Sequence, residues 1–339
     1  MFPILDVLKL LLFGTFSTTV LKTIFQYQVI SPRGHQQSFN KSYFMVFMMF
    51  FSMMFAYLFE KKSEKPKSVN NRSRILFLLL TLFDISAAIT SGLALSKSSV
   101  PASLYQLLGA SLLVFTTINA RLFLKRKQRP HQWISVFVII FGLTCVGVSA
   151  QLDTPQQQSS ELLIGIGLLL IAQLAWSLQF VVAEFLLKKL DSSPLQVVYY
   201  EGFFGSTIMM AIVLPLLQCL EGVDSGSVEN SFETLHILLL NPILIVFLCI
   251  FVLIILFYNI IGQQVTKKLS SVHRTVLESL RSLGVWLVGL LFYYATNGSF
   301  GEPWMPHSWL KSLGFVVLVV GSLVYNCAPG FKLKGLCYK

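Results

Sequence analysis

The chain has 339 residues, of which 55% are hydrophobic and only 12% are charged. Soluble domains carry roughly 25% charged residues, so this composition excludes an ordinary soluble protein and indicates an integral membrane protein. The formal net charge of +11 would suggest a nucleic-acid partner for a soluble protein. Here the basic residues lie in short segments between apolar runs, so membrane topology explains them and no nucleic-acid partner is expected.

The predicted elements are apolar runs of about 20 residues, the length that a helix needs to cross the hydrocarbon core. Each run is predicted to be a helix, because every backbone polar group in lipid needs a partner within its own segment. In chain order the runs are 5–27, 42–59, 75–95, 102–124, 133–150, 162–187, 195–219, 242–264, 272–296 and 309–327. The predicted fold class is therefore an all-α membrane protein of about ten transmembrane helices.

The segments between the runs alternate in charge. One set carries most of the Lys and Arg residues, whereas the other set has few of them and includes an acidic stretch over 221–233. Basic connections favour the cytosolic side, so both termini are placed on a cytosol-like side and the number of spans is expected to be even. The basic segments are 61–74, 125–129, 188–189, 267–268 and 332–339.

The two halves of the chain resemble each other. Residues 98–115, SSVPASLYQLLGASLLVF, align with residues 270–287, SSVHRTVLESLRSLGVWL, which places Gln106 opposite Glu278. An odd number of spans per half inserts the halves with opposite orientation, as in transporters built from inverted repeats. The sequence thus predicts two five-helix repeats, 1–155 and 156–339, in one integral membrane domain. Chance similarity between apolar helices is the alternative.

Several charged or polar side chains lie inside the apolar runs. A charge at the bilayer centre costs roughly 2.5–3.5 kcal/mol on insertion scales, so such a residue usually faces a cavity or a partner. The predicted substrate-binding residues are Lys22, Asp84, Gln106, Glu201, Glu278 and Arg281.

Each candidate also has a purely structural interpretation. Lys22 and Glu184 lie near predicted span ends and could extend to the lipid headgroups. Glu278 has the helical spacing of an ion pair with Arg274 and with Arg281, so the three could simply neutralise one another. Arg274 is also close enough to a span end to reach the headgroups.

Motifs for catalysis and for metal or cofactor binding are absent from the sequence. It contains no Walker A loop, no H-E-x-x-H, no G-x-S-x-G and no paired-histidine spacing. The five cysteines are scattered and read as small apolar residues. The chain is therefore not expected to be an enzyme, and neither a cofactor nor a metal is expected.

Three segments carry a family resemblance: 83–110, 197–205 (VVYYEGFFG) and 263–286 (QQVTKKLSSVHRTVLESLRSLGVW). They resemble the drug/metabolite transporter superfamily, and more closely solute carrier family 35 subfamily F and the chloroquine-resistance-transporter-like proteins. The resemblance implies ten helices in two inverted repeats and alternating access to a central cavity. Known substrates of the superfamily include nucleotide-sugars, drugs, amino acids and peptides.

The resemblance also assigns positions to individual residues. It places Asp84 at the acidic position of the third helix, Gln106 at the glutamine of the fourth helix, and Glu201 in the E-G-x-F-G motif. The pair Glu278 and Arg281 corresponds to the acidic-S-L-R pattern of the ninth helix, whose counterpart arginine in the fourth helix is replaced by Gly109. The second span also lacks the acidic residue that relatives often carry.

Together these features predict a secondary, alternating-access transporter or exchanger of a small polar or charged organic solute across an internal membrane. Its expected partners are the lipid bilayer and the solute. The alternative is a transport-degenerate member of the fold that serves as an accessory subunit beside other membrane subunits. The family resemblance implies a lysosome- or Golgi-type endomembrane as the location, with the mitochondrial inner membrane as the alternative.

Overall fold

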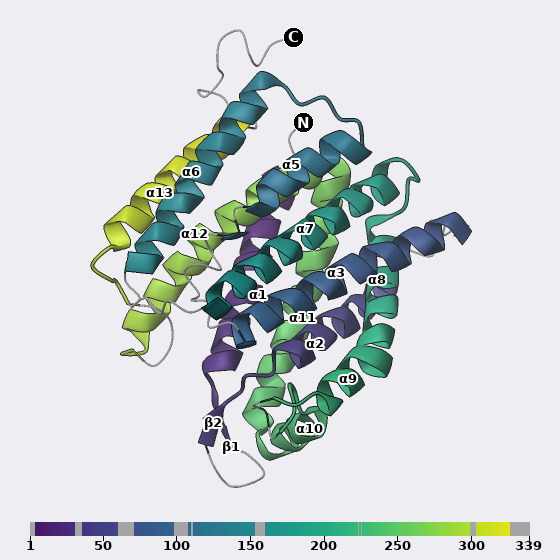
Figure 1. The fold of residues 1–339 in the computed structure, drawn as a ribbon, viewed down its shortest axis with the longest axis vertical. Coiled ribbons are helices and arrows are strands. Elements are labelled where there is room, and N and C mark those ends of the chain that lie inside the picture. Colours follow the sequence, from purple (N-terminus) through teal and green to yellow (C-terminus); the bar gives the residue numbers. More distant parts are fainter. Residues whose placement is uncertain are drawn as a thin grey trace.

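Helices make up nearly all of the computed structural model, which describes residues 4–30, 36–59, 71–97, 108–109, 111–152, 160–222, 224, 226–298 and 303–325 (Figure 1). Within these residues, nine helices are long and apolar enough to cross a membrane, and they match nine of the ten predicted runs. The all-α membrane fold is thus confirmed. The helices are α1 (Ile4–Gln26), α2 (Ser42–Met54), α3 (Asn71–Lys97), α5 (Ser111–Phe123), α6 (Pro130–Leu152), α7 (Ser160–Lys188), α8 (Pro194–Ile208), α9 (Leu214–Cys219), α10 (Ser231–Leu240), α11 (Pro242–Lys268), α12 (Ser271–Ala295) and α13 (Ser308–Tyr325).

Two of the spans change their helical form along their length. The second continues from α2 into a 3₁₀ turn, η1 (Phe55–Phe59), and the seventh passes from α8 through a π-helical turn, η2 (Met209–Val213), into α9. Pro215 lies two residues after the end of this π turn, in the first turn of α9. A proline has no N–H, and its ring crowds the carbonyl one turn earlier, so the helix widens there.

The fourth predicted run is only partly described. It appears as the 13-residue helix α5, and residues 98–107 and 110 lie outside the described residues. Gln106 is therefore outside them as well.

Two elements differ from the expected pattern of helices and simple connections. A short antiparallel hairpin, β1 (Gln28–Ile30) with β2 (Gln36–Ser38), pairs Val29 with Gln37 between the first two spans. Helix α10 lies within and beyond the acidic stretch, where a plain connection was expected. Its N-cap Asn230 accepts a hydrogen bond from the Glu233 N–H at 2.9 Å, which is the side-chain capping that starts a helix.

Helix pairs from different parts of the chain pack side by side. Helix α6 packs along α13, α3 along α7, and α2 along α8. Helix α1 packs against α11 and α12, and α7 packs against α3 and α5. In the predicted repeat α1 of the first half corresponds to α7 of the second, α3 corresponds to α11, and α5 corresponds to α12. The contacts of α1 with α11 and α12 are therefore the counterparts of the contacts of α7 with α3 and α5. The packing therefore agrees with the two-repeat organisation, which stays a prediction.

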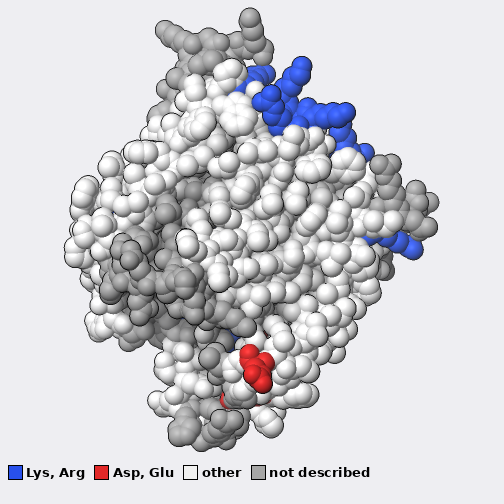
Figure 2. All heavy atoms as spheres, viewed as in Figure 1, with Lys and Arg blue, Asp and Glu red and all other residues white. Residues whose placement is uncertain are grey.

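Charge separates the two ends of the helix bundle. Asp6 in the first turn of α1 pairs with Lys268 at the end of α11 at 2.5 Å. His273 in α12 contacts Tyr325 at the end of α13, with 4.8 Å between ring centroids. The first helix thus begins, and the last described helix ends, at one end of the bundle. This end is the upper one in Figure 2, which shows Lys and Arg gathered towards it and acidic side chains at the lower end. We call these the basic end and the opposite end; the assignment of the basic end to the cytosol stays a prediction.

Candidate functional site

Glu278, in the first third of α12, lies between the two arginines that the sequence placed on the same helix face. Its carboxylate accepts a hydrogen bond from the Tyr258 hydroxyl of α11. It lies 3.0 Å from the Arg281 Nε and 3.7 Å from the Arg274 Nε. The predicted intrahelical ion pairs are therefore present. They are not the whole arrangement, because Tyr258 and the groups below join them to other helices.

Arg281 extends from α12 to α1. Its Nη1 donates to the Thr18 Oγ1 at 2.8 Å, and its guanidinium lies 5.5 Å from the Tyr258 ring centroid. Gly14 makes room for this side chain, since a Cβ there would come within 2.5 Å of the Arg281 Cδ. A cation in the membrane interior thus bridges α1 and α12.

Arg274 was not among the predicted substrate-binding residues, although the structure buries it beside them. It is 3% exposed, so the interpretation that it reaches the headgroups is wrong. Its guanidinium lies 4.5 Å from the Phe180 ring centroid of α7. It also fills the space beside Gly262, where a Cβ would lie 2.8 Å from Nη2. The Nε and Nη1 atoms have no hydrogen-bond partner among the described residues; the 3.7 Å to Glu278 is beyond hydrogen-bonding distance.

Asp84 of α3 and Glu201 of α8 lie near Arg274. Asp84 accepts a hydrogen bond from the Trp176 indole at 3.0 Å, and Glu201 accepts one from the Gln179 amide at 2.7 Å. Glu201 is 1% exposed and lies close enough to Asp84 and Arg274 for their charges to interact. The structure thus brings two predicted carboxylates and an unpredicted arginine together.

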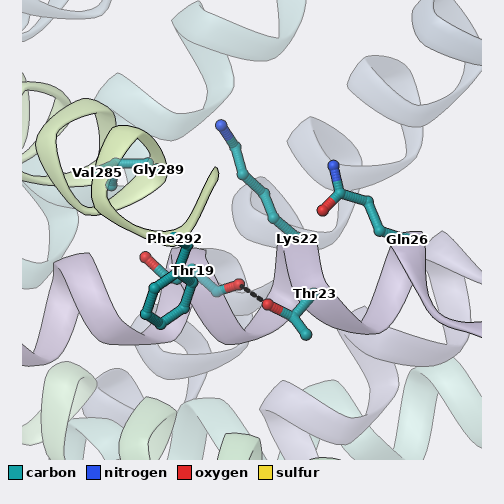
Figure 3. A pocket seen from close by; sticks show the side chains of 7 residues that line it. All are labelled: Thr19, Lys22, Thr23, Gln26, Val285, Gly289 and Phe292. Carbon is teal, nitrogen blue, oxygen red and sulfur yellow. Dashed lines mark hydrogen bonds between the residues drawn. The ribbon is translucent and has the colours of Figure 1, made fainter. Parts of the chain in front are cut away.

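Lys22 lies on the same face of α1 as Thr18, one turn further towards the opposite end. It lines a small cavity of about 30 Å³ between α1 and α12 (Figure 3). Such a volume holds about two water molecules. The lining residues are Thr19, Lys22, Thr23, Gln26, Val285, Gly289 and Phe292.

Gly109, the position where the family pattern has an arginine, is described, although Gln106 is not. A Cβ added at Gly109 would meet no described atom within 4 Å. Among the described residues, no group of three or more His, Cys, Asp or Glu side chains is placed to hold a metal.

A second charged cluster lies at the basic end, around Glu184 of α7. Glu184 is 4% exposed, so the prediction that it extends to the headgroups is wrong. Its Oε2 accepts from the backbone N–H of Ser271 at 2.8 Å and from the Ser271 hydroxyl at 2.5 Å. Its Oε1 lies 3.0 Å from the Lys188 Nζ and 3.3 Å from the Arg126 Nη1. A carboxylate at the N-terminus of α12 is favoured by the helix dipole, so this cluster joins α7, α12 and the α5–α6 connection.

A buried carboxylate also lies at the opposite end, in the connection between α9 and α10. Glu229 accepts hydrogen bonds from the backbone N–H groups of Tyr43 and Phe44, at 2.8 and 2.6 Å, in the first turn of α2. Burial raises the pKa of Glu229 to about 7, against the lowering effect of these two hydrogen bonds. Nearby, Lys41 pairs with Asp224 at 2.5 Å.

Comparisons with known proteins identify relatives of this chain. The family described as purine nucleobase transmembrane transport matches residues 8–217. Solute carrier family 35 member F6 of Mus musculus is 31% identical over 258 residues, which cover 74% of this chain and 66% of that protein. The Homo sapiens protein of the same name is 30% identical over the same shares. The chain thus spans just under two thirds of the length of these relatives.

Two further matches are more distant. An uncharacterised protein of Schizosaccharomyces pombe is 26% identical over 265 residues, 77% of each chain. A solved crystal structure superposes over 95% of this chain and 96% of its own with a TM-score of 0.58, at 16% identity. At that identity the likeness shows the fold alone.

Proposed function

Because the chain belongs to the purine nucleobase transmembrane transport family and is related to solute carrier family 35 member F6, we propose that it is a secondary transporter of a small polar organic solute. It is an integral, multi-pass membrane protein whose relatives are solute carriers and not enzymes. The family description makes a purine nucleobase the first solute to test.

The observation that carries the proposal is the charged network inside the spans. Asp84, Glu201, Arg274, Glu278 and Arg281 come from α3, α8 and α12 and are held by partners on α1, α7 and α11. Buried charges are costly in a membrane and mark solute or ion pathways. A network that joins helices of both halves suits a carrier whose halves move against each other.

The lining of the α1–α12 cavity suits the edge of a nucleobase. Arginine and lysine donate to the ring nitrogen and carbonyl oxygen of guanine, and glutamine pairs with the amino and ring nitrogen of adenine. Lys22 and Gln26 line the cavity, and Arg281 lies one turn away along α1 at Thr18. Phe292 offers an aromatic face on which a base can stack.

Alternating access would then be a movement of α12 and its neighbours. We propose that the contacts of Glu184 with Ser271 and the pairing of Asp6 with Lys268 close the basic end in this state. The cavity is too small for a base, so α1 and α12 would part to admit one. We propose that Glu278 and Arg281 move with α12 while Asp84 and Glu201 stay with α3 and α8. The two carboxylates disfavour double ionisation in a low dielectric and would hold a proton during part of the cycle.

The test is uptake by proteoliposomes that contain the purified full-length chain. Radiolabelled adenine, guanine and hypoxanthine are the solutes, and Arg281→Ala is compared with Arg121→Ala, whose side chain is exposed on α5. We expect uptake by the wild type and by the Arg121 variant and a loss of at least tenfold for Arg281→Ala. Near-wild-type uptake by Arg281→Ala, with both proteins inserted equally, would refute the assignment.

The same preparation addresses the alternative role as an accessory subunit. A protein that stays at fixed stoichiometry with other membrane subunits in mild detergent, and transports none of the solutes, would support that role. Immunostaining against lysosomal, Golgi and mitochondrial markers tests the proposed endomembrane location.

A further inference from the structure

Cations outnumber carboxylates along the described part of the contact between α1 and α12. Lys22 lines the cavity, and Arg281 lies against Thr18, one helical turn from Lys22. The carboxylate next to them is Glu278, which is shared by two arginines and the Tyr258 hydroxyl.

The other buried carboxylates are directed elsewhere. Asp84 accepts a hydrogen bond from Trp176, and Glu201 accepts one from Gln179; both partners belong to α7, none of whose residues lines the cavity. Both carboxylates also lie close enough to Arg274 for their charges to interact with it. Lys22 in the lining and Arg281 one turn away bring positive charge to this contact, and the low dielectric of a helix bundle strengthens the attraction of such charges for an anion.

The neutral part of the lining is compatible with a flat ring. Gly289 leaves space on α12, and the Phe292 side chain lies on the same wall (Figure 3). The Thr23 hydroxyl donates to the Thr19 carbonyl at 3.0 Å, so its donor is already used. Lys22 is the charged donor in this lining, so it has the greatest attraction there for a negatively charged group.

From this arrangement we propose that the solute is a small planar organic anion and that Lys22 selects for its charge. The inference rests on the proposed transport function and narrows its substrate class. For purines it means that an anionic oxopurine is preferred to a neutral base. The ring stacks against Phe292, and the anionic edge faces Lys22 and Arg281.

The experiment uses two matched pairs of probes in proteoliposome uptake with the full-length protein. Urate and hypoxanthine are an anionic and a neutral purine at neutral pH; nicotinate and nicotinamide are an anion and a neutral amide on the same pyridine ring. The variants are Lys22→Gln, which removes the charge, Lys22→Arg, which keeps it, and Arg121→Gln as a control outside the cavity.

We expect the anion to be favoured at least tenfold in at least one pair. We expect Lys22→Gln to lower that preference by about tenfold, the effect of one nearby charge in a partly screened site, while Lys22→Arg and Arg121→Gln retain it. A failure to favour the anion in both pairs, or an anion preference that Lys22→Gln leaves unchanged, would overturn the inference.

The outcomes separate this inference from the proposed function. Hypoxanthine uptake equal to or above urate uptake, together with nicotinamide uptake equal to or above nicotinate uptake, keeps purine transport and rejects the anion preference. Transport of nicotinate without either purine keeps the anion preference and rejects purine transport. Transport of none of the four probes, by protein that is folded and inserted, rejects both.

Discussion

Replacing Glu278 by glutamine tests whether this carboxylate holds the network together. The substitution keeps the length of the side chain and one acceptor oxygen but removes the charge that two arginines share. The Arg274 and Glu278 side chains are only 4% and 10% exposed, whereas the Arg281 side chain is 30% exposed. Solvent therefore screens Arg281 but hardly Arg274.

The expected loss of stability follows from these exposures. Removing one partner of a buried ion pair costs about 3–5 kcal/mol, because the other charge is left uncompensated. Asp84 and Glu201 still interact with Arg274, and Arg281 adds little because exposed pairs contribute about 0–1 kcal/mol. We therefore expect Glu278→Gln to lower the free energy of unfolding by about 3 kcal/mol, the lower end of that range.

The assay is SDS-induced unfolding in mixed micelles, followed by the fluorescence of the five tryptophans. The matched control is Glu221→Gln, whose side chain is exposed in the connection after α9. In a double-mutant cycle, Arg274→Gln combined with Glu278→Gln should cost less than the sum of the two single changes. Additive losses, or a Glu278→Gln variant within about 0.5 kcal/mol of the wild type, would refute the reasoning.

Three further predictions concern packing, the closed end and pH. Gly142→Ala places a Cβ 2.7 Å from a backbone oxygen of α13 and should cost about 1–3 kcal/mol; Gly167→Ala, which meets no described atom within 4 Å, should be neutral or slightly stabilising in the same thermal melts. Glu184→Gln removes the carboxylate that holds the start of α12. A cysteine introduced as Ser279→Cys, in a background without the native cysteines, should then react faster with a maleimide added at the basic end. Equal rates would contradict the proposal that Glu184 closes this end. Burial raises the pKa of Glu229 to about 7, above its ordinary value of about 4.3, so its contribution to stability is full below about pH 4.3 and is lost as pH rises through 7. The melting temperature should therefore fall between pH 5 and pH 8, and fall less in Glu229→Gln.

The spans and part of the candidate site were predictable because their signals are local. A run such as 242–264 is long, apolar and without charge, so it forms a helix whatever its neighbours are, and α11 is found there. The spacing of Glu278 and Arg281 likewise determines that they meet on one helix face. The hairpin of β1 and β2 was missed because three-residue strands carry no periodic pattern.

The partners across helices were decided by tertiary structure. Arg274 and Glu184 both lie near span ends, where sequence alone allows a long side chain to extend to the headgroups. Packing instead buries Arg274 against Phe180 of α7 and holds Glu184 at the first residue of α12. The amino-acid sequence determined which segments enter the membrane, because the insertion of each segment depends on its own length and hydropathy. Which charges share a site depended on the rotation of each helix about its axis, and that rotation is set by contacts between residues more than 80 positions apart, as for Glu184 and Ser271.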